Sequence, residues 1–135
     1  ELCKEAGARR AVPLKVSGPF HTPLLEEASV NLAKELNNIE FQDMKIPVLT
    51  NVTAEVIADS SEIKDLLIKQ VKSSVKWSET IRNMIDMGID TFIEIGPSRT
   101  LSGFLRDIDR NVTSFNVEDM KSLNKTLEGI MVRNA

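Results

Sequence analysis

The sequence has too few cysteine and histidine residues for several common kinds of site. Its single cysteine, Cys3, excludes an internal disulfide. One cysteine and one histidine cannot by themselves complete a structural zinc site, although carboxylates could add ligands. Such sparse cysteine usage is typical of a reducing compartment, so we expect a cytoplasmic protein. We set Cys3 aside as a nucleophile because it stands at an apparent helix end with no base placed beside it.

Long apolar runs and an excess of positive charge are also absent. No apolar run approaches membrane-spanning length, and nothing resembles a signal peptide. The formal net charge of −3 over 135 residues gives no general attraction to nucleic acid or to an anionic membrane surface. We therefore expect neither a membrane nor a nucleic-acid partner. With 41% hydrophobic and 27% charged residues, the composition fits one ordinary globular domain.

The hydrophobic periodicity predicts alternating strands and helices. Apolar residues in alternation or in short runs predict strands over residues 11–16, 46–52, 91–95 and 112–117, with Pro13 favouring an edge position for the first. Stripes of helical spacing predict helices over residues 23–37, 63–74, 77–88, 101–108 and 120–130. On the first of these we expect Ala28 and Leu36 to face the core. The strand–helix–strand order of residues 91–117 predicts two parallel strands joined by a right-handed crossover.

The strand over residues 91–95 ends at Gly96 and Pro97. Its nearly continuous apolar sequence suits a strand covered on both faces. A turn that follows such a strand lies at the carboxyl edge of the sheet, where ligands bind in open α/β folds. Gly96 could let a substrate approach the backbone, but a plain tight turn is an equally good interpretation.

The only histidine, His21, stands between an extended segment and a helix start. Gly18 and Pro19 break the extended segment, Thr22 is a good N-cap, and Pro23 suits the first helical position. Loops that rigid elements hold on both sides often carry catalytic residues. From position alone His21 is a candidate base, and a surface or capping histidine without chemistry is the alternative.

Four segments resemble one enzyme family in the same order. The first is Gly-Pro-Phe-His-Thr at residues 18–22, preceded by Pro-Leu-Lys-Val-Ser. The others are Ile-Lys-Gln-Val at 68–71 with Val-Lys-Trp at 75–77, Phe-Ile-Glu-Ile-Gly-Pro at 92–97, and Leu-Ser-Gly-Phe at 101–104. Together they span most of the chain, which resembles malonyl-CoA:acyl carrier protein transacylases of fatty acid biosynthesis.

The resemblance implies an α/β fold that is only part of an enzyme. In that family a ferredoxin-like subdomain is inserted in an α/β-hydrolase-like acyltransferase body with parallel strands. Residues 1–16 would be the end of the inserted subdomain, and residues 17–135 the C-terminal part of the large subdomain. The chain begins without Met in what reads as the end of a helix stopped by Gly7. We therefore expect the chain to be a fragment, and its partner to be the missing N-terminal part of the same enzyme.

The resemblance also implies the chemistry. His21 would be the general base and acid for a serine that carries the malonyl group from coenzyme A to the phosphopantetheine thiol of acyl carrier protein. The main-chain carbonyl of Gln70 would orient the imidazole, as the aspartate does in serine-protease triads. From the sequence pattern alone, Gln70 could equally be a boundary glutamine with a solvated amide. Malonyl-CoA and acyl carrier protein would be substrates, and no cofactor is expected.

The nucleophile that this chemistry needs is not in the sequence. No Gly-x-Ser-x-Gly motif occurs, and the one Gly-x-Ser, at residues 96–98, is followed by Arg99 and Thr100. The family's oxyanion-hole glutamine and its carboxylate-binding arginine are also outside the chain. The sequence therefore does not indicate which acyl group the enzyme selects. We expect the chain alone to be inactive. A non-catalytic binding module and a serine hydrolase fragment remain as alternatives.

Two groups of basic residues are a further feature. They are Lys4, Arg9, Arg10 and Lys15 near the N-terminus, and Lys69, Lys72 and Lys76 around Gln70. A solvated surface explains both groups. The alternative is a basic rim that steers the acidic acyl carrier protein.

Overall fold

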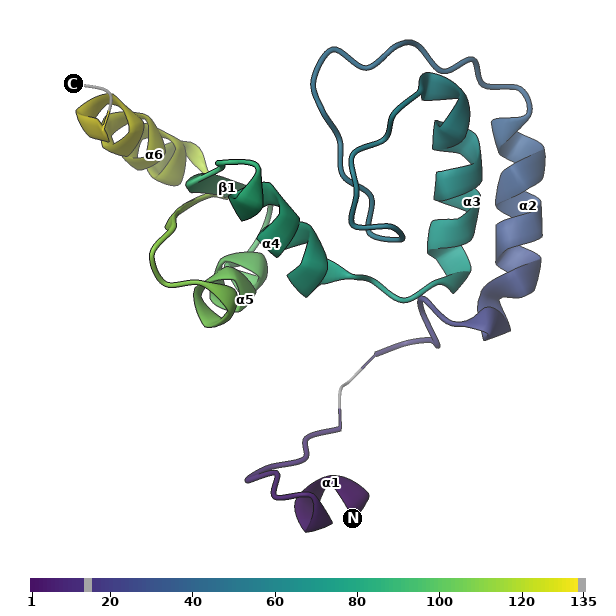
Figure 1. Cartoon of the computed structure of the whole chain (residues 1–135), viewed down its shortest axis with the longest axis horizontal. Coiled ribbons are helices and arrows are strands. Elements are labelled where there is room, and N and C mark those ends of the chain that lie inside the picture. The colour runs from purple at the N-terminus through teal and green to yellow at the C-terminus, as the bar shows by residue number, and fades with distance from the viewer. Residues whose placement is uncertain (14–15, 134–135) are drawn as a thin grey trace.

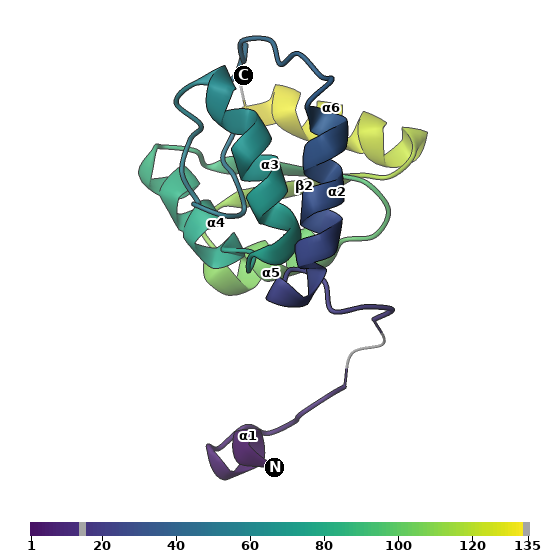
Figure 2. The same ribbon diagram turned by 90° about the vertical axis from the view of Figure 1, so that its right-hand side faces the viewer.

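The computed structural model describes residues 1–13 and 16–133. In chain order the elements are α1 (Leu2–Glu5), the 3₁₀ turn η1 (Pro23–Leu25), α2 (Glu26–Leu36), the 3₁₀ turn η2 (Ser60–Glu62), α3 (Ile63–Lys72), α4 (Trp77–Asp86), β1 (Thr91–Ile95), α5 (Thr100–Ile108), β2 (Thr113–Val117) and α6 (Met120–Arg133). Figure 1 shows α2 and α3 side by side, with the sheet and α4 to α6 forming a second group. In both views α1 lies apart from the rest (Figures 1 and 2).

Helices α2 and α3 pack against each other in opposite directions. Glu26 at the start of α2 pairs with Lys72 at the end of α3, and Asn37 just past α2 accepts a hydrogen bond from Lys64 near the start of α3. The buried face of α2 carries Leu36, as the periodicity predicts. Ala28 was wrongly placed on that face: it is exposed, and its neighbour Ser29 is buried instead. Ser29 thus takes the place of Ala28 on the stripe, while Leu32 and Leu36 lie on it as expected.

Strands β1 and β2 form a parallel pair, as the sequence predicts. Thr91 lies opposite Thr113, and the register continues to Ile95 opposite Val117. The expectation that β1 is covered on both faces is wrong for this chain, because the side chains of Ile93 and Ile95 are 43% and 82% exposed. Within the described residues no further strand pairs with this sheet.

Two predicted strands are not strands in the structure. Residues 11–13 and 16 are irregular, and the remainder of that predicted strand lies outside the described residues. Residues 46–52 form only an isolated antiparallel bridge between Leu49 and Val56. Alternating apolar residues give a strand only when a neighbouring strand supplies hydrogen-bond partners, and residues 1–13 and 16–133 contain no such strand for either segment. The segment containing Leu49 turns back on itself instead.

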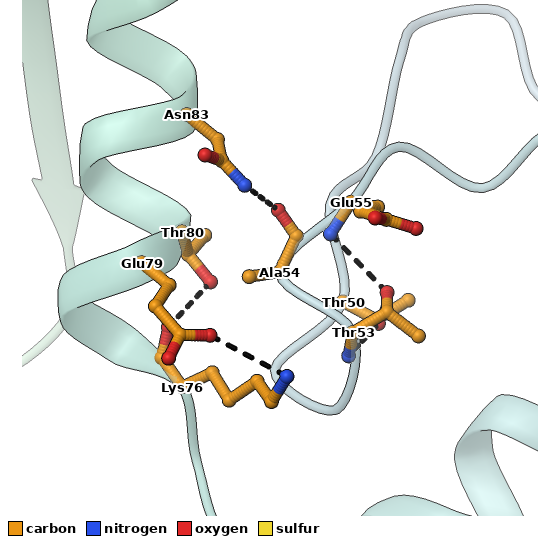
Figure 3. A network of polar contacts seen from close by, with 8 residues as sticks. All are labelled: Thr50, Thr53, Ala54, Glu55, Lys76, Glu79, Thr80 and Asn83. Carbon is orange, nitrogen blue, oxygen red and sulfur yellow. Dashed lines mark hydrogen bonds and ion pairs between the residues drawn. The ribbon is translucent and has the colours of Figure 1, made fainter.

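That turn is held against α4 by a polar network (Figure 3). The Thr50 and Thr53 hydroxyls lie 2.8 Å apart. Asn83 of α4 donates its side-chain amide to the carbonyl oxygen of Ala54 at 2.9 Å. Ala54 is 1% exposed and has a φ of 64°, a left-handed conformation that an alanine adopts only when its surroundings hold it there. The network therefore holds the loop around Ala54 against α4.

Helices α5 and α6 complete the second group. Glu94 of β1 accepts hydrogen bonds from the main-chain N–H groups of Leu101 and Ser102 and from the Ser102 hydroxyl, so it caps the first turn of α5. Gly129 of α6 faces the ring of Phe115 in β2, where an added Cβ would lie 2.5 Å from the ring. Among the described residues, no helix is long and apolar enough to cross a membrane.

Candidate active site

The loop before α2 presents His21 in an unusual backbone conformation. Its φ is 59°, in the left-handed region where a residue with a Cβ is strained by roughly 1–2 kcal/mol. The next residue, Thr22, caps η1: its hydroxyl accepts from the N–H of Leu24 at 3.3 Å and donates to the carbonyl of Pro19 at 2.8 Å. These bonds tie the chain on both sides of His21. Backbone strain of this kind persists where the surroundings fix the conformation, which is common at functional sites.

The ring of His21 contacts the end of α3. Its Nδ1 lies 2.9 Å from the main-chain oxygen of Gln70, a residue 49 positions away. A carbonyl oxygen can only accept a hydrogen bond, so Nδ1 carries the proton in this contact. In a neutral imidazole that leaves the Nε2 lone pair free to accept another proton. The sequence resemblance implied this pair of residues, and the structure brings the two together.

The carbonyl of Gln70 is available because of where α3 ends. The helix stops at Lys72, and Ser73 has an extended backbone with φ −111° and ψ 148°. The last four carbonyl groups of an α-helix have no N–H partner within the helix, and Gln70 is among them. The imidazole of His21 supplies the missing donor. The negative end of the α3 dipole also faces the ring. The Gln70 side chain has no part in this contact.

The other features that the sequence singled out lie elsewhere. At the carboxyl end of β1, Gly96 has a φ of 146°, and the turn that follows is held by Asn116 donating to the carbonyl of Ser98 at 2.7 Å. A cavity of about 910 Å³ lies between α5, β2 and α6, and neither His21 nor Gln70 lines it. The turn at Gly96 therefore has a structural explanation, and the cavity is separate from the histidine.

The cysteine and the basic residues are placed as follows. Cys3 is exposed on α1, a helix that buries none of its residues. In the group around Gln70, Lys72 forms an ion pair with Glu26 at 2.6 Å and Lys76 pairs with Glu79 at 3.4 Å. Lys69 of the same group is exposed, as are Lys4, Arg9 and Arg10 of the N-terminal group. Lys15 lies outside the described residues.

Three of the carboxyl groups with lowered pKa values cap helix starts, and a fourth, Asp90, precedes β1. The hydroxyl and then the N–H of Ser61 lower the pKa of Asp59, which caps η2. Ser122 acts in the same way on Asp119. For Glu94 the hydrogen bond from the Ser102 hydroxyl is the largest cause, and it outweighs desolvation, which would raise the pKa. The three capping groups stabilise helix ends and are not candidates for proton transfer.

Comparison with known proteins identifies the class of fold. No family model matches the chain. The chain is 44% identical to a crystal structure of malonyl CoA-acyl carrier protein transacylase from Clostridium perfringens, with a TM-score of 0.92, over 98% of this chain and 42% of that one. A second structure, of a malonyl-transacylase in complex with a type II polyketide acyl carrier protein, is 37% identical with a TM-score of 0.88, over 94% of this chain and 41% of that one. The fold is thus part of an α/β acyltransferase body.

The sequence relatives agree with the structures. The chain is 39% identical over 134 residues to the malonyl CoA-acyl carrier protein transacylase of Bacillus subtilis, which is 99% of this chain and 42% of the relative. The chain matches the C-terminal part of malonyl-CoA:acyl carrier protein transacylases. It spans less than half the length of the relatives that it matches.

Proposed function

We propose that this chain supplies the proton-transfer half of an acyltransferase that moves a malonyl group from coenzyme A to acyl carrier protein. The observation that carries the proposal is the 2.9 Å contact between Nδ1 of His21 and the main-chain oxygen of Gln70. A base held in one tautomer with its other nitrogen free is what a serine nucleophile needs. The serine itself would come from the N-terminal part of the enzyme, which these 135 residues do not include.

The proposed reaction has two displacements. First, Nε2 of His21 takes the proton of the serine hydroxyl while the serine oxygen attacks the thioester carbon of malonyl-CoA. The carbon–sulfur bond breaks, and the coenzyme A thiolate leaves with the proton from Nε2. Next, Nε2 deprotonates the phosphopantetheine thiol of acyl carrier protein, whose sulfur attacks the serine ester. The serine oxygen leaves and recovers its proton from His21.

The same proposal includes the acceptor protein, the cofactor requirement and the cellular location of the enzyme. Acyl carrier protein is the acceptor that we propose, and the family member solved with an acyl carrier protein supports this choice. No cofactor is needed for proton transfer and acyl exchange of this kind. A cytoplasmic location fits an enzyme that uses coenzyme A esters and a carrier protein. We assign residues 1–16 to the end of a ferredoxin-like subdomain and residues 17–135 to the large subdomain.

The test is reconstitution. The purified chain should transfer no malonyl group by itself, and co-expression with the upstream part of the enzyme should give malonyl-acyl carrier protein. His21→Ala should abolish this turnover. His21→Asn is the sharper variant, because asparagine tolerates the left-handed backbone at this position but has no imidazole. We expect it to lower kcat by a factor on the order of 10³ or more while the fold is kept.

Three outcomes would contradict the proposal. Malonyl transfer by the isolated chain would show that the nucleophile lies within it. Full activity of His21→Asn in the completed enzyme would show that the imidazole is not the base. Release of free malonate without a malonyl-carrier product would identify a hydrolase, in which water is the acceptor.

A further inference from the structure

The contact between His21 and Gln70 joins the loop before α2 to the end of α3, so it depends on how α2 and α3 are held together. We propose that Ser29, assisted by the Glu26–Lys72 ion pair, is a positioning residue that sets the Gln70 carbonyl against the imidazole of His21. This inference rests on the proposed function for its catalytic consequence. Its structural part can be tested without any activity measurement.

Ser29 is better placed than the Glu26–Lys72 ion pair to hold α3 in position. Its side chain is 1% exposed, and its hydroxyl donates to the main-chain oxygen of Ile68 at 2.9 Å. Ile68 stands two residues before Gln70 on α3. A carbonyl oxygen has two lone pairs, so that of Ile68 can accept from the serine while it remains in the helical ladder. The hydroxyl thus ties α2 to the backbone of α3 within one helical turn of the catalytic contact.

The ion pair acts on the other side of Gln70. Lys72 stands two residues after it, at the last position of α3, and its ammonium group lies 2.6 and 2.7 Å from the two carboxylate oxygens of Glu26. Glu26 is the first residue of α2, five positions after His21. The pair is solvent-exposed and therefore weak by itself. Together with Ser29, however, it brackets the Gln70 carbonyl along α3.

The geometry leaves little tolerance at this point. The contact from Nδ1 to the Gln70 oxygen is 2.9 Å, and a shift of α3 along α2 by about 1 Å would take it out of hydrogen-bonding range. Without that acceptor the ring is free to rotate or to change tautomer, and Nε2 is no longer presented in one direction. Displacements of this size typically cost up to about 10² in rate.

The chain offers a direct spectroscopic test because His21 is its only histidine. In the chain labelled with ¹⁵N-histidine, the wild type should show one Nδ1–H signal protected from solvent exchange. Ser29→Ala should lose or shift that signal, and Lys72→Gln should weaken its protection. Thr80→Val is the matched control, since it removes another buried hydroxyl, 3% exposed, that also donates to a carbonyl at 2.9 Å, that of Lys76 at the start of α4. It should leave the His21 signal unchanged.

Two spectra would overturn the inference. One is a wild-type chain with no protected Nδ1–H, which would remove the contact itself. The other is Ser29→Ala with the wild-type Nδ1–H shift and exchange rate, which would show that the serine does not hold the contact. A signal lost equally in Ser29→Ala and Thr80→Val would mean general loosening of the fold, and it would also count against a specific role for Ser29.

A kinetic arm separates this inference from the proposed function. In the enzyme completed by its upstream part, Ser29→Ala should lower kcat roughly tenfold with little change in KM for malonyl-CoA, because the ring is misplaced and substrate binding is not touched. An unchanged kcat would contradict the positioning role. If His21→Asn keeps full activity, the proposed function fails, while the spectra still report whether Ser29 sets the His21–Gln70 contact.

Discussion

Two mid-helix glycines give opposite predictions for the same substitution. Replacing glycine by alanine inside a helix stabilises it by up to about 1 kcal/mol, because alanine has the higher helix propensity. At Gly103 of α5 an added Cβ meets nothing within 4 Å, so the full gain is expected. At Gly129 of α6 it would lie 2.5 Å from Cε1 and 2.9 Å from Cζ of Phe115.

The clash at Gly129 decides whether Gly129→Ala stabilises or destabilises the chain. Ordinary contact needs the carbon atoms roughly 3.5–4.0 Å apart, so the ring of Phe115 must move by about 1 Å. Overpacking of this kind costs about 1–3 kcal/mol, which exceeds the gain in helix propensity. We therefore expect Gly129→Ala to destabilise the chain by about 1 kcal/mol and Gly103→Ala to stabilise it by somewhat less. The difference between the two variants should be near 2 kcal/mol.

Urea unfolding followed by the fluorescence of Trp77, the only tryptophan, measures this difference. The midpoint should move in opposite directions for the two variants at unchanged slope. Phe115→Leu should relieve the clash, so a double-mutant cycle with Gly129→Ala should show favourable coupling. Equal stabilisation by both alanines would refute the reasoning, since it would mean that Phe115 does not pack against α6 at Gly129.

Two further predictions concern charged groups. The pKa of Glu94 is lowered in the folded chain, so its stabilising effect is present above the ordinary carboxyl pKa and is lost as pH falls through the folded value. The stability difference between wild type and Glu94→Gln should therefore be largest near neutral pH and shrink below about pH 4.5, and a difference independent of pH would contradict the capping role. Lys69 is exposed one residue before Gln70, so in the completed enzyme Lys69→Glu should raise KM for acyl carrier protein and leave transfer to free pantetheine unchanged. An unchanged KM would leave Lys69 as ordinary solvated surface.

Local sequence signals predicted the helices and the parallel pair well. The Thr22 cap and the bounds of β1 follow from neighbouring residues, and the structure has both. The strand expected at residues 46–52 failed because strand formation depends on a partner strand, which residues 16–133 do not provide for it. The relatives are more than twice as long as this chain, so we expect residues outside it to cover the exposed apolar side chains of β1.

The candidate site was predictable in a different way. Position suggested His21, but only the family resemblance connected it to Gln70, because no local pattern links residues 49 positions apart. Ser29 was missed, although its spacing from Leu32 and Leu36 fits a helical stripe as well as that of Ala28 does. A buried serine on a core-facing stripe signals a hydroxyl that needs a main-chain partner, and the carbonyl of Ile68 is that partner.

In the proposed mechanism a main-chain carbonyl orients the imidazole, which has a consequence of its own. An aspartate in that position would carry a full charge and would need its own hydrogen bonds to stay ionised. The end of α3 already has carbonyl groups without helical partners, so Gln70 can hold the imidazole with no additional side chain. The acceptor cannot titrate. Under the proposed function, the position of the helix end is what matters, and Ser29 is the residue that we propose holds the end of α3 against α2.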